Sequence, residues 1–204
     1  SCSQQSYITK YDVLKGLKKG GAFLLNCIWS EAELEENLPA AMKRYIADNH
    51  INFYIVNAVK IAQDLGLGGR FNMIMQSAFF KLSQIIPLEE AVKYLKDSVT
   101  DSYGLKGQKI IDMNNAAIDK GIDALIKINV PASWKTAADQ APATQKTAPE
   151  FIEKILIPMN RQEGDNLPVS AFIGMEDGTF PSGTAAYEKR GIAVDVPRWI
   201  ADNC

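Results

Sequence analysis

The chain has 204 residues, and its 22 basic and 24 acidic residues leave a net charge of −2. This balance excludes a general nucleic-acid binder, which needs a basic face, and no apolar run approaches the roughly 20 residues of a membrane span. The length corresponds to one full domain, or to one domain with a smaller addition. Three cysteines far apart in the sequence exclude a disulfide framework and indicate a reducing cytosol.

The N-terminal residues have neither the basic nor the apolar region of a signal peptide. They also lack an initiator Met, which predicts that the chain is cut from something longer. Predicted elements follow from apolar periodicity, glycine breaks and capping patterns. In chain order they are a helix over 7–17, a strand over 22–26, a helix opened by the capping-box pair Ser30 and Glu33, a helix over 39–47, a strand over 51–56, and helices over 59–65, 71–86, 88–99 and 107–128.

The alternation of strand and helix with short connections predicts an α/β layer with a parallel sheet. Only two strands are evident before residue 130, so the sheet is expected to be incomplete. Residues 131–149 are rich in Pro, Ala, Thr, Lys and Gln, which is typical of a linker or an extended surface arm. Residues 151–158 form a short ordered segment. Residues 160–204 are predicted to be an irregular arm that packs onto something larger.

A glycine run before the helix predicted over 71–86 is the first candidate site. Gly68 and Gly69 would let a phosphate approach a helix N-terminus closely, where Arg70 could pair with it and Asn72 could donate a hydrogen bond. The run matches neither of the two common glycine motifs of phosphate-binding loops. The alternative is a glycine C-cap followed by a tight turn between helices, and the spacing alone favours this alternative.

A second candidate is Glu176-Asp177-Gly178 with Asn203 further along the chain. Thiamine diphosphate enzymes hold Mg²⁺ with a Gly-Asp-Gly segment and a later Asn, and oxygen ligands suit this ion. The first glycine is a glutamate here, and the intervening stretch contains no amphipathic helix. An Asp-Gly turn is therefore the preferred interpretation.

The remaining candidates are assigned structural roles rather than chemistry. They are His50 as a surface or capping residue, Cys27 as a small buried hydrophobe, Cys2 as an unactivated thiol, and Glu31, Glu33, Glu35 and Glu36 as a solvated helix face.

Several long segments together resemble one family. Residues 10–14, 20–26, 66–76 and 78–80 are similar to the gamma domain of the pyruvate:ferredoxin (flavodoxin) oxidoreductases. Residues 176–181, 183–184 and 187–194 are similar to the short Glu-Lys-Arg (EKR) segment that follows that domain. The segments stand in the family's order and cover nearly the whole chain.

The resemblance implies a Rossmann-like gamma domain over residues 1–130, a linker over 131–150 and the EKR segment over 151–204. In the family, a ferredoxin-like domain follows, and Cys204 would be the first ligand of its iron–sulfur cluster. Gly68, Gly69, Arg70 and Asn72 would then lie near a phosphate of coenzyme A. The family's glycine-rich loop for coenzyme A is expected upstream of Ser1.

The activity implied by the resemblance is the decarboxylation of pyruvate to acetyl-CoA with reduction of ferredoxin or flavodoxin. The full enzyme would use thiamine diphosphate, Mg²⁺ and [4Fe–4S] clusters, with coenzyme A as substrate, as a cytoplasmic homodimer. The chain itself is expected to hold no cofactor, to be inactive alone, and to bind the enzyme's other domains. Two alternatives stay open: a purely structural interdomain module, and a free-standing nucleotide-binding protein.

Overall fold

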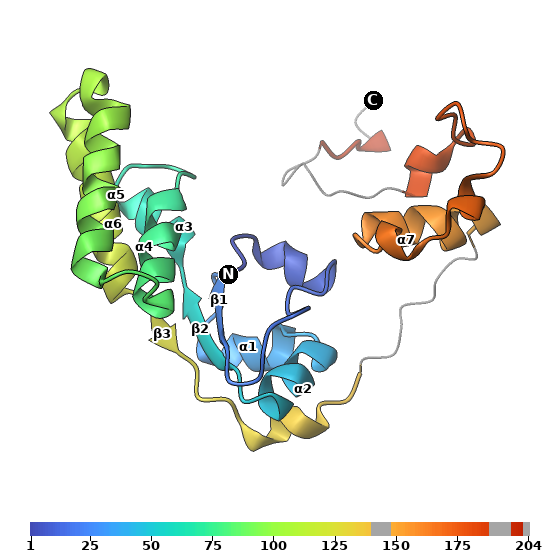
Figure 1. Ribbon diagram of the computed structural model, residues 1–204, viewed down its shortest axis with the longest axis horizontal. Helices are drawn as coiled ribbons and strands as arrows, with labels where there is room; N and C mark the ends of the chain where they lie inside the picture. The colour runs from blue at the N-terminus through green and yellow to red at the C-terminus, as the bar shows by residue number, and fades with distance from the viewer. Residues whose placement is uncertain (140–147, 188–196, 202–204) are drawn as a thin grey trace. The chain divides into compact units, whose positions relative to one another are not determined.

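The computed structural model describes residues 1–139, 148–187 and 197–201. The chain divides into two compact units, Ser1–Ala141 and Pro142–Cys204 (Figure 1). The Glu-Lys-Arg triplet at 188–190, Asn203 and Cys204 lie outside the described residues.

The first unit is a mixed α/β fold, as the sequence predicts. Its elements are η1 (Gln5–Thr9), β1 (Ala22–Asn26), α1 (Glu31–Asn37), α2 (Ala40–Asp48), β2 (Asn52–Val56), α3 (Ala58–Asp64), α4 (Asn72–Ser83), α5 (Leu88–Tyr103), η2 (Gly104–Lys106), α6 (Gln108–Asp123), β3 (Ile126–Lys127) and η3 (Ala132–Thr136). The capping box predicted for Ser30 and Glu33 is present at the start of α1.

The sheet has the strand order β1-β2-β3. The predicted parallel pairing of β1 and β2 is confirmed, with Leu25 opposite Ile55. The third strand, β3, is antiparallel to β2. The prediction of one helix over 107–128 is wrong beyond residue 123, because α6 ends there and β3 follows. The reason is the free edge of β2: Ile128 donates its backbone N–H to the Phe53 carbonyl over 2.9 Å. An apolar run at a helix end cannot be told from a short strand by periodicity alone.

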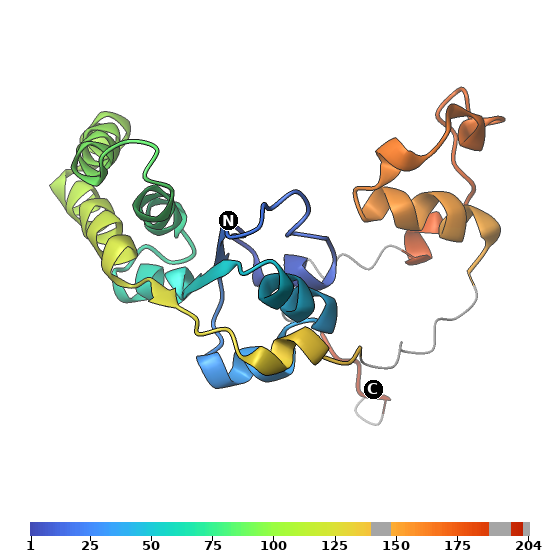
Figure 2. The same cartoon turned by 60° about the horizontal axis from the view of Figure 1, so that its bottom comes forward.

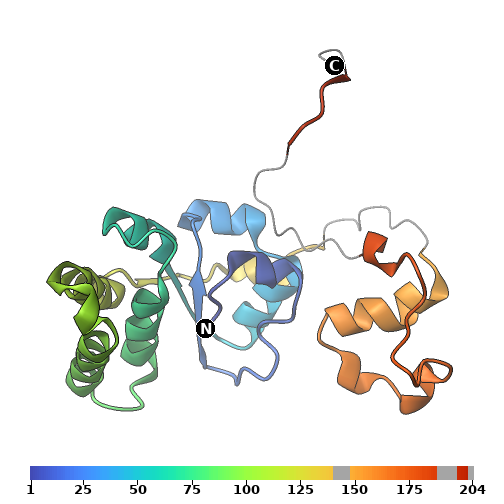
Figure 3. The ribbon, with the colours of Figure 1, turned by 90° about the horizontal axis from the view of Figure 1, so that it is seen from above.

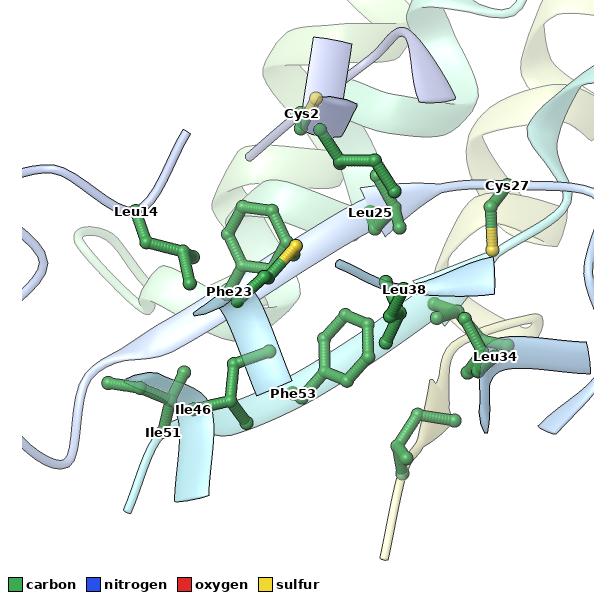
Figure 4. Packing of buried hydrophobic residues seen from close by; sticks show 14 of the residues in the cluster. Cys2, Leu14, Phe23, Leu25, Cys27, Leu34, Leu38, Ile46, Ile51 and Phe53 are labelled. Carbon is green, nitrogen blue, oxygen red and sulfur yellow. The ribbon is translucent and has the colours of Figure 1, made fainter. Parts of the chain in front are cut away.

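Side chains of β1 and β2 alternate between two apolar cores. Figure 3 shows helices on both sides of these strands. Phe23, Leu25 and Phe53 face the core that α1 and α2 cover, and Figure 4 shows this packing. Leu24 and Val56 face the opposite core, which α3, α4 and α6 cover. Because both faces of β1 and β2 are covered, these two strands carry apolar residues in succession, at 23–25 and 53–56, rather than at every second position.

Helices α4, α5 and α6 form a layer on one side of the sheet (Figure 2). The backbones of α4 and α6 approach closely at Gly121. A Cβ atom there would lie 2.3 Å from Ser77 Oγ and 2.4 Å from the Ile74 carbonyl oxygen. Only glycine therefore fits at this crossing without displacement of its neighbours. No helix among the described residues is long and apolar enough to span a membrane.

The helix predicted over 7–17 is wrong. The chain has only the short 3-10 helix η1 there, followed by turns. Asp12 accepts the Leu14 backbone N–H at 3.2 Å through its side chain, which replaces a helical bond with a local turn. Ile8 and Leu14 are still buried in the first core, so the apolar spacing reflects packing of an irregular segment.

The start of the predicted linker also differs from the prediction. Residues of η3 pack against α2, and the Trp134 side chain is buried in the first core at 6.2 Å from the Phe53 ring. The loop-like composition of this segment therefore gives no sign that Trp134 belongs to the core, because a single aromatic side chain produces no periodic pattern.

The second unit has short helices only among its described residues. They are η4 (Ile152–Leu156, a π-helix), α7 (Ile157–Asn160), η5 (Gly164–Asn166), η6 (Val169–Phe172) and η7 (Thr184–Tyr187). Ile152 and Ile155 are buried, but Val169, Ile173 and Trp199 are exposed at 90%, 74% and 75%. The short helices agree with the predicted irregular arm, and its packing onto something larger stays a prediction.

Candidate functional site

The glycine run connects α3 to α4. Gly66 has a φ of +76° and donates its N–H to the Gln63 carbonyl, while Leu67 donates to the Ala62 carbonyl. These two bonds, at 2.9 and 2.8 Å, form a Schellman motif that ends α3. The glycine C-cap considered as the alternative interpretation is therefore present at Gly66.

The four candidate residues follow this cap in the connection to α4 and its first residue. Gly68, Gly69, Arg70 and Asn72 are all exposed. Gly68 has a φ of +62°, which explains a glycine at that position. Gly69 has no positive φ, and a Cβ at either glycine would meet nothing within 4 Å. Packing against the described residues therefore does not require glycine at position 69.

The start of α4 has unsatisfied hydrogen-bond capacity. Its N-cap residue, Phe71, supplies no side-chain cap, and the first turn contains no acidic residue. The first N–H groups and the positive end of the helix dipole therefore favour an anion from outside the chain. Arg70 lies beside this end, where its Nε donates to the Leu67 carbonyl over 3.1 Å.

The candidate surface is open rather than enclosed. A cavity of about 800 Å³ in the first unit lies elsewhere, between η1, the α1–α2 connection and residues 133–139, and none of the four candidates lines it. An open anion site of this kind contributes only about 0.3–1 kcal/mol from the helix dipole. Firm binding would need further groups.

The segment around Asp177 forms a turn, in agreement with the interpretation that the sequence favours. Asp177 accepts the Thr179 backbone N–H at 2.9 Å, Glu176 accepts the Gly174 N–H at 2.9 Å, and Gly178 has a φ of +81°. The hydrogen bond from Thr179 lowers the pKa of the Asp177 carboxyl, and that from Gly174 lowers the pKa of Glu176. Both carboxylates thus stabilise the turn by accepting hydrogen bonds from backbone N–H groups.

The two described cysteines have structural positions. Cys2 and Cys27 are buried beside β1, and burial raises the pKa of each thiol. Both thiols therefore stay protonated near neutral pH, as the sequence interpretation requires. His50 is exposed at a turn with φ of +49°, which agrees with its surface assignment. In residues 1–139, 148–187 and 197–201, no group of three or more His, Cys, Asp or Glu side chains could hold a metal ion.

Sequence reasoning missed one cluster of side chains around Glu35. This carboxylate accepts a hydrogen bond from the Trp134 indole N–H and lies 3.6 Å from the Lys43 ammonium. Glu35 was predicted only as part of a solvated helix face. Nothing in the local sequence signals its partners, because Trp134 lies 99 residues further along the chain.

Two family models match the chain in succession. Residues 1–124 match the family "Pyruvate ferredoxin/flavodoxin oxidoreductase". Residues 137–193 match EKR, described as a domain of unknown function. A layered α/β unit followed by this second match defines a section of a larger oxidoreductase.

The chain belongs to the pyruvate ferredoxin/flavodoxin oxidoreductase family. It is 68% identical to the pyruvate-flavodoxin oxidoreductase of Enterobacter agglomerans and 53% identical to the pyruvate:ferredoxin oxidoreductase of Moorella thermoacetica. Both matches cover 100% of this chain and 17% of the relative. Among solved structures, pyruvate oxidoreductase subunit PORC of Thermotoga maritima is 20% identical over 56% of each chain, with a TM-score of 0.43.

Proposed function

We propose that this chain is a non-catalytic section of a 2-oxoacid oxidoreductase that converts pyruvate to acetyl-CoA. The observation that carries the proposal is the family match over residues 1–124, together with 68% identity along all 204 residues to a pyruvate-flavodoxin oxidoreductase. The names of the relatives support pyruvate as substrate and ferredoxin or flavodoxin as electron acceptor. The complete enzyme is proposed to be a cytoplasmic homodimer.

Within the enzyme, we propose that Gly68, Gly69, Arg70 and Asn72 take part in receiving coenzyme A. The uncapped start of α4 and the absence of acidic residues in its first turn support an anionic ligand. Open space at Gly69 supports close approach of a group from outside the chain. The guanidinium of Arg70 would pair with a phosphate and hold it against the helix end.

The other cofactors are assigned to the rest of the enzyme. Thiamine diphosphate with Mg²⁺ would supply the carbanion chemistry, and [4Fe–4S] clusters would carry the electrons. Cys204 is proposed as a ligand of one cluster, with this chain supporting the domain that holds it. The 204-residue chain alone is proposed to be inactive.

Variants of the complete enzyme test the coenzyme A assignment. Loss of one charge-assisted hydrogen bond predicts that Arg70→Ala raises KM for coenzyme A about tenfold. KM for pyruvate should stay constant. Arg161→Ala, which removes an exposed arginine of the second unit, is the matched control and should change neither constant. An unchanged KM for coenzyme A in Arg70→Ala would refute the placement.

The exposed apolar side chains of the second unit favour one alternative, a purely structural interdomain module. Calorimetric titration of the 204-residue chain separates the possibilities. We expect weak or undetectable coenzyme A binding. Tight binding that survives Arg70→Ala would place the phosphate elsewhere, and micromolar binding of simple nucleotides would favour a free-standing nucleotide-binding protein.

A further inference from the structure

Residues 125–136 fall between the two family matches, which end at 124 and begin at 137. The structure gives this stretch a definite place in the first unit. It contains β3, the buried Ile128 and the buried Trp134. The first unit therefore continues beyond the end of the first family match.

Three side chains of the α1–α2 region hold residues 132–139, which we name the strap. Glu35 accepts a hydrogen bond from the Trp134 indole N–H, and Lys43 neutralises that carboxylate while donating to the Glu35 carbonyl. Lys43 is only 8% exposed, whereas the Glu35 side chain is about half exposed, so these contacts lie at the edge of the first core. They fix the middle of the strap.

Arg44 holds the end of the strap. Its Nη1 donates to the Ala137 carbonyl, and its Nη2 lies 2.9 and 3.0 Å from the two carboxylate oxygens of Asp139. The Arg44 guanidinium thus donates hydrogen bonds to a backbone carbonyl and to a carboxylate at the same time. Its planar group with several N–H donors allows this geometry, whereas a lysine ammonium would not. Ala137 and Asp139 are also among the first three residues of the second family match.

We propose that the strap is a clasped extension of the first unit, held closed by Arg44, which fixes the point where the chain enters the EKR region. The strap also forms one wall of the cavity of about 800 Å³, through Ser133, Ala137 and Asp139. Release of the Arg44 contacts would free that wall and let η3 open locally more often, while the strands of the sheet stay in place. The clasp is therefore a local device, separable from folding of the sheet.

Tryptic cleavage after Lys135 reports on the strap, because cleavage within η3 requires it to open locally. In the 204-residue chain, Arg44→Ala should raise the rate of this cleavage about tenfold, the effect of losing charged hydrogen bonds. Asp139→Ala keeps the bond to the Ala137 carbonyl, so its increase should be smaller, about threefold. Lys60→Ala, which removes the exposed Lys60–Asp64 pair, is the matched control and should have no effect at Lys135.

Cleavage after Lys81 in α4, measured in the same digest by mass spectrometry, distinguishes local opening from global unfolding. The proposal requires the Lys81 rate to stay constant in Arg44→Ala. An unchanged rate after Lys135 would overturn it. An equal rise at Lys135 and Lys81 would also overturn it, because the clasp would then be inseparable from the fold.

Discussion

Trp134 and Trp199 show how differently the two units use their apolar residues. Trp134 is 2% exposed in the first core, whereas Trp199 is 75% exposed. The described part of the second unit buries Ile152 and Ile155 but leaves several other large apolar side chains in contact with solvent. The first unit also exposes apolar side chains, such as Ile85 and Leu105, but it builds large buried cores, whereas the described part of the second unit buries few apolar residues. The exposed apolar side chains of the second unit indicate contacts with other parts of a larger protein, which fits a chain covering 17% of its relatives' length.

Matched tryptophan substitutions should separate the two units most strongly. Trp134→Ala leaves a cavity beside Phe53 and deprives Glu35 of a donor, so we expect a loss of about 3–5 kcal/mol in unfolding free energy. Trp199→Ala should change it by no more than about 0.5 kcal/mol. Urea denaturation measures both. Equal losses would show that the second unit buries Trp199 in solution.

A pair of glycine substitutions should give the next largest effect. Gly121→Ala forces a Cβ against α4 and should cost about 1–3 kcal/mol or somewhat more. Gly69→Ala has open space around it and should leave stability unchanged. Thermal unfolding of both variants measures the difference. If Gly69→Ala were as destabilising as Gly121→Ala, glycine at position 69 would be a packing requirement.

Substitutions on the second unit should alter association rather than stability. Val169→Ser combined with Ile173→Ser removes two of the most exposed apolar side chains. We expect the free energy of unfolding to change by about 0.5 kcal/mol or less, while self-association of the chain decreases. Sedimentation velocity over a concentration series measures the association. A large loss of stability would contradict an open apolar surface.

The smallest expected effect is a pH dependence in the first core. Burial raises the pKa of the Cys27 thiol above its ordinary value of 9.0. Folding therefore favours the protonated form, and this contribution to stability is complete below pH 9 and is lost as pH rises toward the folded-state pKa. Cys27→Ala should lose less stability than the unsubstituted chain between pH 8 and 10, as measured by urea denaturation. An identical slope in both would contradict a buried thiol.

Elements with local chemical signals were predictable from the sequence. The capping box of Ser30 and Glu33, the apolar strands β1 and β2 and the helix α4 are all present. The irregular segment at 7–17 was not predictable, because the Asp12 side chain competes with helical hydrogen bonding. Strand β3 and the burial of Trp134 depend on partners far away in the sequence, which no local pattern encodes.

The candidate site was predictable only in part. Gly66 has the capping role that the spacing favours, and its two Schellman hydrogen bonds account for it. Gly68, Gly69, Arg70 and Asn72 remain exposed together at the start of α4, and their role with coenzyme A is still a prediction. Their function would depend on groups beyond this chain, so neither its sequence nor its fold alone can define it.

Hydrogen exchange of the 204-residue chain tests the contrast between the two units most directly. Amides of β1, β2 and α4 should be strongly protected, because their hydrogen bonds lie between two covered faces. Amides of residues 164–187 should exchange much faster. This result would confirm that the first unit has a stable core and that the second unit leaves its apolar side chains exposed in the isolated chain. Equal protection in both regions would contradict the account, because the second unit would then have a stable core of its own.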